Sequence, residues 1–149
     1  MQTLLQAGFA SVDEIDGALI VGFADRPYET SEYFMFERSL DPSDDDGVYL
    51  EHTDQAYGIY GTVTSCVLSS GRIEVTVDDR TAEHLETETT FAIDFSCDHE
   101  SLLRVQSGLE RILSGTTCRF SKATLSNRED PLQVSGDIVN TRPSGTKPR

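Results

Sequence analysis

Cysteines, histidines and an excess of carboxylates are the residues of this 149-residue chain that could carry chemistry. Cys97 and His99 flank Asp98, but the chain lacks the paired-cysteine and HxxxH spacings of known zinc sites. It also lacks a glycine-rich phosphate loop and the G-x-S-x-G and HExxH motifs. The motifs therefore predict no catalytic residue, no cofactor and no metal, and they favour a protein that is not an enzyme.

A run of aspartates, Asp41, Asp44, Asp45 and Asp46, lies just before Gly47. If Gly47 took the sixth position of an EF-hand loop, a proline and a threonine would stand at the first and twelfth positions. Calcium requires an aspartate and a bidentate glutamate there, so the run is not an EF-hand. We interpret it as a solvated acidic loop, with a weak, adventitious cation site as the alternative.

A second group of polar residues, Glu51, His52 and Asp54, lies within four positions of the sequence. Carboxylates on both sides of a histidine could orient its ring and assist proton transfer. A surface histidine at the end of a strand explains the same pattern without chemistry. A small ligand-binding domain or an enzyme with a pocket around these three residues is the alternative function that the sequence leaves open.

The net charge is −14, from 26 acidic and 12 basic residues, and it is unevenly distributed. Residues 1–113 carry −17, whereas residues 114–149 carry +3. An acidic surface repels nucleic acid and anionic lipid and speeds the encounter with a basic partner, so we expect no direct binding of nucleic acid or membrane. No apolar run reaches the roughly 18 residues of a membrane span, and the N-terminus lacks the basic first region of a secretory signal. We therefore expect a cytoplasmic protein.

Apolar and alternating runs predict an antiparallel meander in the first half of the chain. The strands are expected at residues 18–24, 31–38, 47–52, 58–68 and 72–77. Ser69, Ser70 and Gly71 are expected to join the last two by a tight turn, in which Gly71 adopts a left-handed backbone angle. In the last of these strands, Ile73 and Val75 share one face with Val77.

Two helices are expected after the meander. Asp78 can cap a short helix that ends at about Leu85, before a last core strand over 91–95. Asp98 can cap an amphipathic helix over 98–113, because its apolar residues recur at steps of three and four. We expect this helix to cover the apolar face of strands 72–77 and 91–95. The fold class is therefore α+β: an antiparallel meander packed on one face by a C-terminal amphipathic helix, with a short helix before the last core strand.

The composition changes after this helix. Residues 1–113 are predicted to form a single α+β domain, and residues 114–149 a basic, polar C-terminal extension. Residues 118–125 and 132–139 could each add a weak strand to it, and we expect the last nine residues to be disordered. A structural or oligomerising role that uses this extension is a third possible function.

The order of these segments resembles the bacterial immunity protein 10 family over roughly residues 16–113. The resemblance is carried by ALIVGFAD at 18–25, SEYFMFERSLD at 31–41, GVYLEHTDQAYGIYG at 47–61, FAIDF at 91–95 and the helix ending in GLERIL. The family is found beside polymorphic toxins in bacterial competition systems. The resemblance implies an immunity protein that is not an enzyme and that binds and neutralises one cognate toxin in the producing cell.

The surface that binds the toxin is predicted from two physical requirements. Aromatic side chains are the rigid anchors that dominate interface energies, and carboxylates at the rim attract a basic partner. Both kinds of residue occur together in one part of the sequence. The predicted partner-binding residues are Asp41, Asp44, Asp45, Asp46, Tyr49, Glu51, Asp54, Tyr57 and Tyr60.

Overall fold

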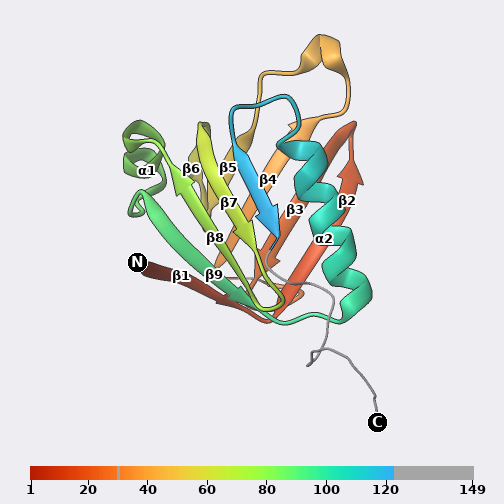
Figure 1. The fold of residues 1–149 in the computed structure, drawn as a ribbon, viewed down its shortest axis with the longest axis vertical. Helices are drawn as coiled ribbons and strands as arrows, with labels where there is room; N and C mark the ends of the chain where they lie inside the picture. Colours follow the sequence, from red (N-terminus) through yellow and green to blue (C-terminus); the bar gives the residue numbers. More distant parts are fainter. Residues whose placement is uncertain (30, 123–149) are drawn as a thin grey trace.

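The computed structural model describes residues 1–29 and 31–122, which form two five-stranded sheets and two α-helices (Figure 1). Sheet A has the strand order β1-β9-β8-β7-β10, and sheet B has the order β2-β3-β4-β5-β6. Within the described residues, only the β1–β9 and β7–β10 pairs are parallel. The α+β fold class predicted from the sequence is confirmed.

Sheet B is a meander in which each strand pairs with the next one along the chain. Its first turn is the two-residue sequence Asp16-Gly17, in which both residues have positive φ angles of 52° and 79°. This is the backbone that a tight hairpin turn requires, and Asp-Gly is a favoured sequence for it. The strands of this sheet are β2 (Phe9–Ile15), β3 (Ala18–Ala24), β4 (Tyr33–Ser39), β5 (Tyr49–His52) and β6 (Asp54–Tyr60).

Sheet A combines the first strand of the chain with four later ones. The alternation predicted for residues 72–77 is confirmed, since Ile73, Val75 and Val77 are buried. Strand β9 pairs with β8 on one side and, in a parallel arrangement, with β1 on the other. The strands are β1 (Gln2–Ala7), β7 (Val63–Leu68), β8 (Arg72–Val77), β9 (Thr90–Phe95) and β10 (Arg119–Lys122).

The core lies between the two sheets. The ring of Phe23 in β3 is 5.2 Å from that of Phe95 in β9, and the ring of Phe34 in β4 is 5.3 Å from that of Phe91. The apolar face of β8 and β9 therefore meets sheet B, which differs from the prediction that the C-terminal helix would cover it. The reason is that a second sheet, which the sequence pattern did not reveal, supplies the partner surface.

The C-terminal helix, α2 (His99–Ile112), packs on β2, β3 and β4. In Figure 1 it lies beside sheet A, on the same side of sheet B. Its predicted apolar residues are buried, and the cap is confirmed: the Asp98 carboxylate accepts the backbone N–H of Ser101 at 2.7 Å. The short helix α1 (Asp79–Leu85) begins in the same way at Asp78, which accepts the N–H of Thr81 at 2.9 Å.

The single strand predicted over 58–68 is two strands in different sheets. The strand in sheet B, β6, ends at Tyr60, and the strand in sheet A, β7, begins at Val63. Gly61 lies in the link between the two strands and packs against α1. A Cβ at this position would be 2.6 Å from Thr81 Cγ2, so a larger residue would clash with the helix. The hydroxyl of Thr81 also accepts the backbone N–H of Thr62 at 3.0 Å, which fixes the crossing between the sheets.

The turn between β7 and β8 forms at the predicted place, with a different backbone. The N–H of Ser69 donates to the carbonyl of Arg72 at 2.8 Å, so the turn is closed. Gly71 does not have a positive φ, and the expectation of a left-handed angle there was wrong. The turn therefore needs no glycine on steric grounds.

The predicted C-terminal extension is described only up to Lys122. The weak strand expected at 118–125 is present as β10, which pairs with β7 at the edge of sheet A. The strand expected at 132–139 and the disorder expected for the last nine residues lie outside the described residues. The domain boundary near Leu113 stays a prediction. Neither of the described helices is long and apolar enough to cross a membrane.

Candidate functional site

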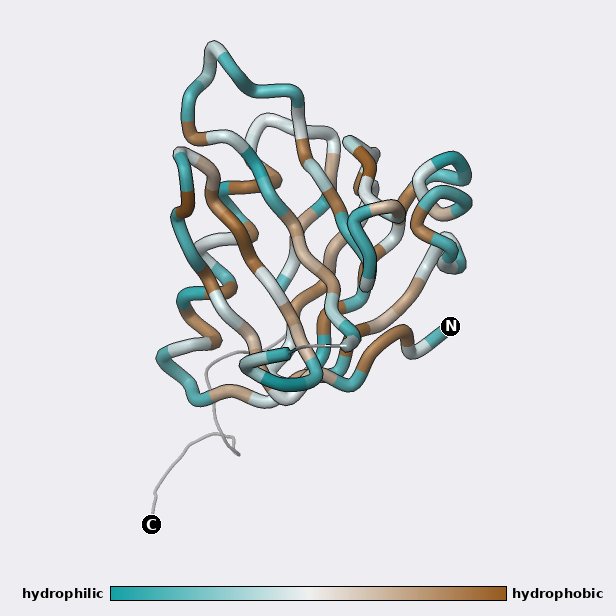
Figure 2. Tube along the Cα trace, turned by 180° about the vertical axis from the view of Figure 1, so that it is seen from behind, coloured by the Kyte–Doolittle hydropathy of each residue, from teal (hydrophilic) through white to brown (hydrophobic). Residues whose placement is uncertain are grey.

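The candidate site lies on the face of sheet B that points away from sheet A, which we call the outer face. Figure 2 looks at the molecule from behind, onto sheet B. The strand register places Glu51 on this face, opposite Met35 of β4 and Gly58 of the edge strand β6. Tyr49 follows along the same side of β5, between Glu37 and Tyr60.

Glu51 is held in place by two tyrosines. It is 9 % exposed and is the one buried charged residue in the described part of the chain. The Tyr49 hydroxyl donates to Glu51 Oε1 at 2.7 Å, and the Tyr33 hydroxyl donates to Oε2. A buried carboxylate needs such donors, because burial without hydrogen bonds is unfavourable by several kcal/mol. The two tyrosines therefore fix both the position and the hydrogen bonding of this carboxylate.

A glycine makes this arrangement possible. A side chain at Gly58 would overlap the hydroxyl of Tyr49, which lies over this position on its way to Glu51. Because Gly58 is opposite Glu51 in the register, its missing side chain leaves the room that the tyrosine ring occupies. The hydrogen bond from Tyr49 to Glu51 therefore depends on three residues of two neighbouring strands: Tyr49 and Glu51 in β5, and Gly58 in β6.

Burial and the negative charge of Glu51 raise the pKa of neighbouring titratable groups. Burial raises the pKa of the Tyr33 and Tyr49 hydroxyls, and their hydrogen bonds to Glu51 raise it further. Both hydroxyls therefore remain protonated donors at neutral pH. Burial also raises the pKa of Glu37, and the charge of Glu51 adds to this effect.

A pocket of about 180 Å³ joins the outer face to the acidic loop. Four acidic residues line it, from the β2–β3 turn, from β4 and from the loop: Asp16, Glu37, Asp44 and Asp46. Arg38 is the basic residue in its lining, and this side chain is paired with Asp45 at 3.0 Å. Tyr49 and Tyr60 line it as well, with their rings 5.2 Å apart in an edge-to-face arrangement. Carboxylates beside aromatic rings are suited to a cationic side chain such as arginine or lysine.

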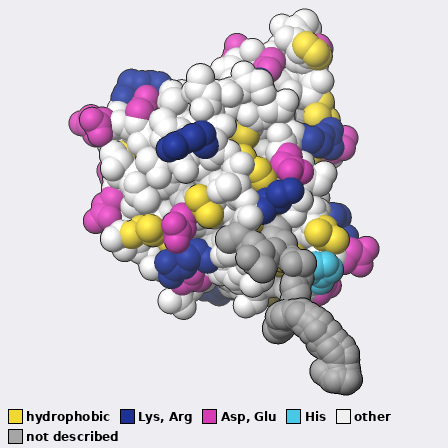
Figure 3. Space-filling model, viewed as in Figure 1, with side chains coloured by type: hydrophobic (Ala, Val, Ile, Leu, Met, Phe, Trp, Pro, Cys, Tyr) yellow, Lys and Arg dark blue, Asp and Glu magenta, His cyan; other side chains and the backbone are white. Residues whose placement is uncertain are grey.

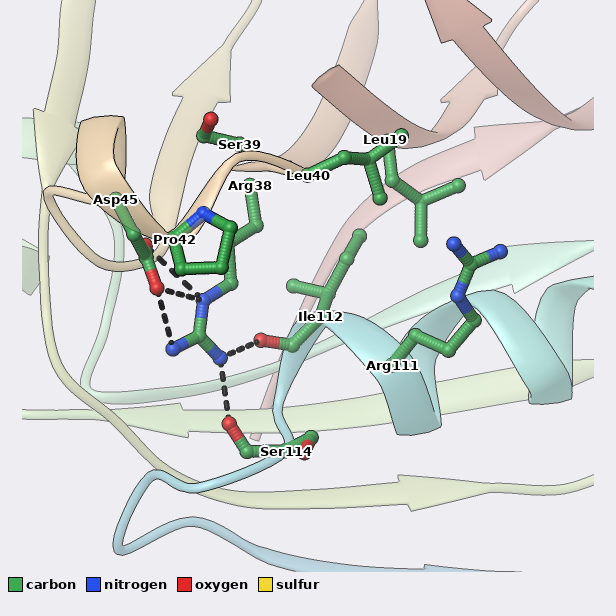
Figure 4. A pocket seen from close by; sticks show the side chains of 9 residues that line it. All are labelled: Leu19, Arg38, Ser39, Leu40, Pro42, Asp45, Arg111, Ile112 and Ser114. Carbon is green, nitrogen blue, oxygen red and sulfur yellow. Dashed lines mark hydrogen bonds and ion pairs between the residues drawn. The ribbon is translucent and has the colours of Figure 1, made fainter. Parts of the chain in front are cut away.

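Asp45 belongs to the predicted surface but has a structural role. Figure 4 shows the guanidinium of Arg38 between Asp45 and the end of α2. Its Nε is 3.2 Å from both carboxylate oxygens, and its Nη1 donates to the carbonyls of Ile112 at 2.7 Å and Ser114 at 2.5 Å. These bonds to Arg38, with a backbone bond to Gly47, lower the pKa of Asp45. Asp45 therefore ties the acidic loop to α2 at one wall of a second pocket, of about 340 Å³.

The remaining aspartates of the loop differ from one another. Asp41 caps a 3-10 turn over Pro42–Asp44, because its carboxylate accepts the N–H of Ser43 at 3.0 Å. Asp44 and Asp46 form no ion pair with any residue in 1–29 or 31–122, and both lie at the pocket next to the tyrosines. Among the aspartates of the loop, these two thus combine a place in the pocket lining with the absence of an ion pair to the described residues.

Asp54 and Tyr57 lie away from this pocket. The Asp54 carboxylate accepts the N–H of Ala56 at 2.9 Å at the start of β6, and its charge acts on Tyr33. Tyr57 lines a different pocket, of about 220 Å³, together with His52. The structure therefore brings Tyr49, Tyr60 and the loop together, and it separates them from the first half of β6.

Glu51, His52 and Asp54 do not converge on one pocket. Neighbouring residues of a strand point to opposite faces, so His52 lies on the other side of β5 from Glu51. Its Nδ1 is 2.9 Å from the carbonyl of Leu85, and its ring is 6.2 Å from that of Phe34. This separation removes the geometric basis of the alternative ligand-binding or enzymatic function.

The described residues contain no group of three His, Cys, Asp or Glu side chains that could hold a metal ion. The acidic loop accordingly has no such grouping within the described ranges. Three residues of the site, Asp16, Tyr33 and Glu37, were missed by reasoning from the sequence. Tyr33 and Glu37 alternate with the phenylalanines Phe34 and Phe36, and this period of two was the signal that could have placed both on the face opposite the phenylalanines.

Comparison with known proteins supports the resemblance noted from the sequence. No curated protein matches the chain. A family model, described as Immunity protein 10, matches residues 4–103, which is more than half of the chain and includes every strand of sheet B. The chain therefore belongs to the immunity protein 10 family.

Proposed function

We propose that this protein is an immunity protein that binds one cognate polymorphic toxin in the cytoplasm of the producing bacterial cell. It neutralises the toxin by steric and electrostatic blocking, without catalysis. The observation that carries the proposal is the pocket lined by four acidic residues and two tyrosines, in a chain of this family. Such a pocket is suited to holding a partner and contains no nucleophile paired with a base.

The chemistry of the site supports a toxin with a basic surface. Asp44 and Asp46 stand in the outward-facing loop without a basic partner among the described residues. Carboxylates in this position accelerate encounter with a basic protein and disfavour acidic ones. Many toxins act on nucleic acid and therefore have basic clefts, which an acidic inhibitor can occupy in place of phosphate.

The proposal is tested with the double variant Asp44→Lys/Asp46→Lys. Asp45 is left unchanged because it holds the loop through Arg38. The matched control is Glu83→Lys/Glu100→Lys, which changes the net charge equally at two exposed helix positions. The toxin to test is the product of the reading frame directly upstream, where that frame encodes a large toxin-like protein. The measurements are survival on co-expression and association rates at several salt concentrations.

We expect the loop variant to lose protection and to associate about tenfold more slowly with a weaker salt dependence, while the control behaves like the wild type. The loop variant should keep the wild-type melting temperature, whereas the control loses the Glu100–Arg104 ion pair in the first turn of α2 and should melt slightly lower. If the wild-type protein neither protects the cell nor forms a complex, the proposed function is wrong. If both double variants protect equally, the loop has no part in binding.

A further inference from the structure

The outer face of sheet B has no partner among the described elements, although it carries apolar side chains. Phe9 and Ile15 lie at the two ends of β2 and are 45 % and 52 % exposed, and Tyr60 on the opposite edge strand is 53 % exposed. The register places all three on this face, with Ile20 and Met35 between them. Apolar side chains gathered on one open face indicate an interaction surface.

The charges on this face have one sign. Strands β2–β6 place Asp13, Glu37 and Glu51 on it and no basic side chain. The opposite side of the molecule, shown in Figure 3, carries basic and acidic side chains together. There Arg72 pairs with Asp94 at 2.7 Å between neighbouring strands of sheet A. The outer face of sheet B thus combines apolar groups with carboxylates, and its strands place no basic side chain there.

We propose that the outer face of sheet B is the docking face for the toxin. The inference rests on the proposed function and adds the place and the chemistry of contact. The toxin presents an apolar surface that contains an arginine or lysine. This cationic side chain enters the pocket beside Tyr49 and Tyr60, where the acidic residues neutralise it and the aromatic rings contact it.

The rigidity of the face favours this use. Glu51 is already fixed by two hydroxyl donors, so binding does not require its side chain to be ordered. The rings of Tyr49 and Tyr60 are in contact before any partner arrives. Pre-ordered groups of this kind reduce the entropy lost on association, which otherwise opposes binding.

The size of the face suits a protein partner. Strands of seven residues, such as β2, β3 and β4, at a spacing of about 4.8 Å give a face of roughly 20 Å by 23 Å. This is about 460 Å² in projection, and a standard interface buries about 800 Å² on each partner, so the docking surface must also include the adjoining acidic loop. A second copy of this chain is disfavoured as the occupant, because it would bring two acidic faces together.

The decisive variant is Ile20→Arg, at the centre of the face. Ile20 is half-buried and lies between Asp13 and Glu37 in the register, so the new charge has acidic neighbours and the fold is retained. The matched control is Val67→Arg, a half-buried aliphatic residue beside Glu74 on the outward side of sheet A. The probe is the purified toxin domain encoded directly upstream, bound to the full-length chain.

We expect Ile20→Arg to weaken binding about 100-fold, as for a central hot-spot residue, and Val67→Arg to change it less than about twofold. Equal binding by wild type and Ile20→Arg, with both variants folded, would overturn the docking face and leave the immunity function standing. A wild-type protein that does not bind the toxin would overturn both.

The occupant is identified by photocrosslinking. A benzophenone amino acid in place of Ile20 is irradiated in the presence of the toxin domain, and the adduct is mapped by mass spectrometry. An adduct to the toxin next to an arginine or lysine supports the proposal. An adduct to a second copy, or to residues 123–149 of the same chain, shows that another segment occupies the face and overturns it.

Discussion

Replacing Gly108 with alanine tests how α2 is docked, because it sets two effects of opposite sign against each other. Gly108 is buried in α2, and a Cβ built there would lie 2.8 Å from Val21 Cγ2 and 3.2 Å from Val12 Cγ1. Alanine is about 1 kcal/mol more favourable than glycine inside a helix. Overfilling a packed core costs about 1–3 kcal/mol, and Val21 is fully buried and β-branched, so it has little freedom to move. We therefore expect a net destabilisation of about 1 kcal/mol.

Equilibrium unfolding in urea measures this balance, with Ser107→Ala as the control. Ser107 is exposed on the same helix, so its replacement reports helix propensity alone and should raise stability by up to about 0.5 kcal/mol. Val21→Ala alone leaves a cavity and should cost about 2 kcal/mol. In the Gly108→Ala background the new methyl group fills part of that cavity, so we expect this cost to fall by about 1 kcal/mol.

Two results together would refute this docking. Gly108→Ala would raise the free energy of unfolding by the full helix-propensity gain, and Val21→Ala would cost the same in both backgrounds. The helix would then not lie on β2 and β3. Packing against β8 and β9, which the sequence pattern predicted, would become the better description.

Three further outcomes are expected from the fold and its titratable groups. Asp98→Ala should lower the free energy of unfolding, while Asp98→Asn keeps an oxygen that can accept the Ser101 N–H and should retain part of the capping energy. Because backbone and side-chain hydrogen bonds to Ser101 lower the pKa of Asp98, the part of this contribution that depends on its charge should be lost as the pH falls below 3.8 and through the lowered pKa. Burial and Glu51 raise the pKa of Glu37 above 4.5, so its ionisation should reduce stability as the pH rises from 4.5 through the raised pKa, and Glu37→Gln should remove that part of the pH dependence measured by urea unfolding. A chain ending at Leu113 should still melt cooperatively in calorimetry, because β10 is a four-residue edge strand; aggregation would instead show that β10 protects the edge of β7.

Local patterns in the sequence predicted the elements that local chemistry decides. The alternation in residues 72–77 and the caps at Asp78 and Asp98 depend on neighbouring positions, and they were confirmed. The division of residues 58–68 depends on the contact of Gly61 with α1, some twenty residues further along the chain. A β-rich run with an internal glycine does not by itself indicate that contact.

The partners of each face could not be predicted in the same way. Strand β1 pairs with β9, and Gln2 lies opposite Phe91 although most of the described chain separates them. Apolar alternation shows that a face is buried but does not show which surface covers it. The sequence therefore predicted correctly that the apolar face of β8 and β9 is covered. It assigned the C-terminal helix as the cover, whereas the covering surface is sheet B, which the sequence pattern did not reveal.

The candidate site shows the same limit at single residues. Residue type alone placed Asp45 with its neighbours in the acidic loop, whereas the structure pairs it with Arg38 and, through it, with the end of α2. Glu51 was selected for its position near tyrosines, but the hydrogen bond from Tyr33 depends on the pairing of β4 with β5. Charge and aromatic content locate a surface, and strand register decides which members act together.

The position of Glu51 links stability to the use of this face. A buried carboxylate without a cationic partner is a poor choice for stability alone, since well-packed apolar groups at such positions are often neutral or stabilising. Here two tyrosines donate hydrogen bonds to that carboxylate on an open sheet face, and a glycine leaves room for one of them. Residues that depart from the requirements of folding tend to lie at functional sites. A partner that brings a positive charge to this face would supply the compensation that the described fold lacks there.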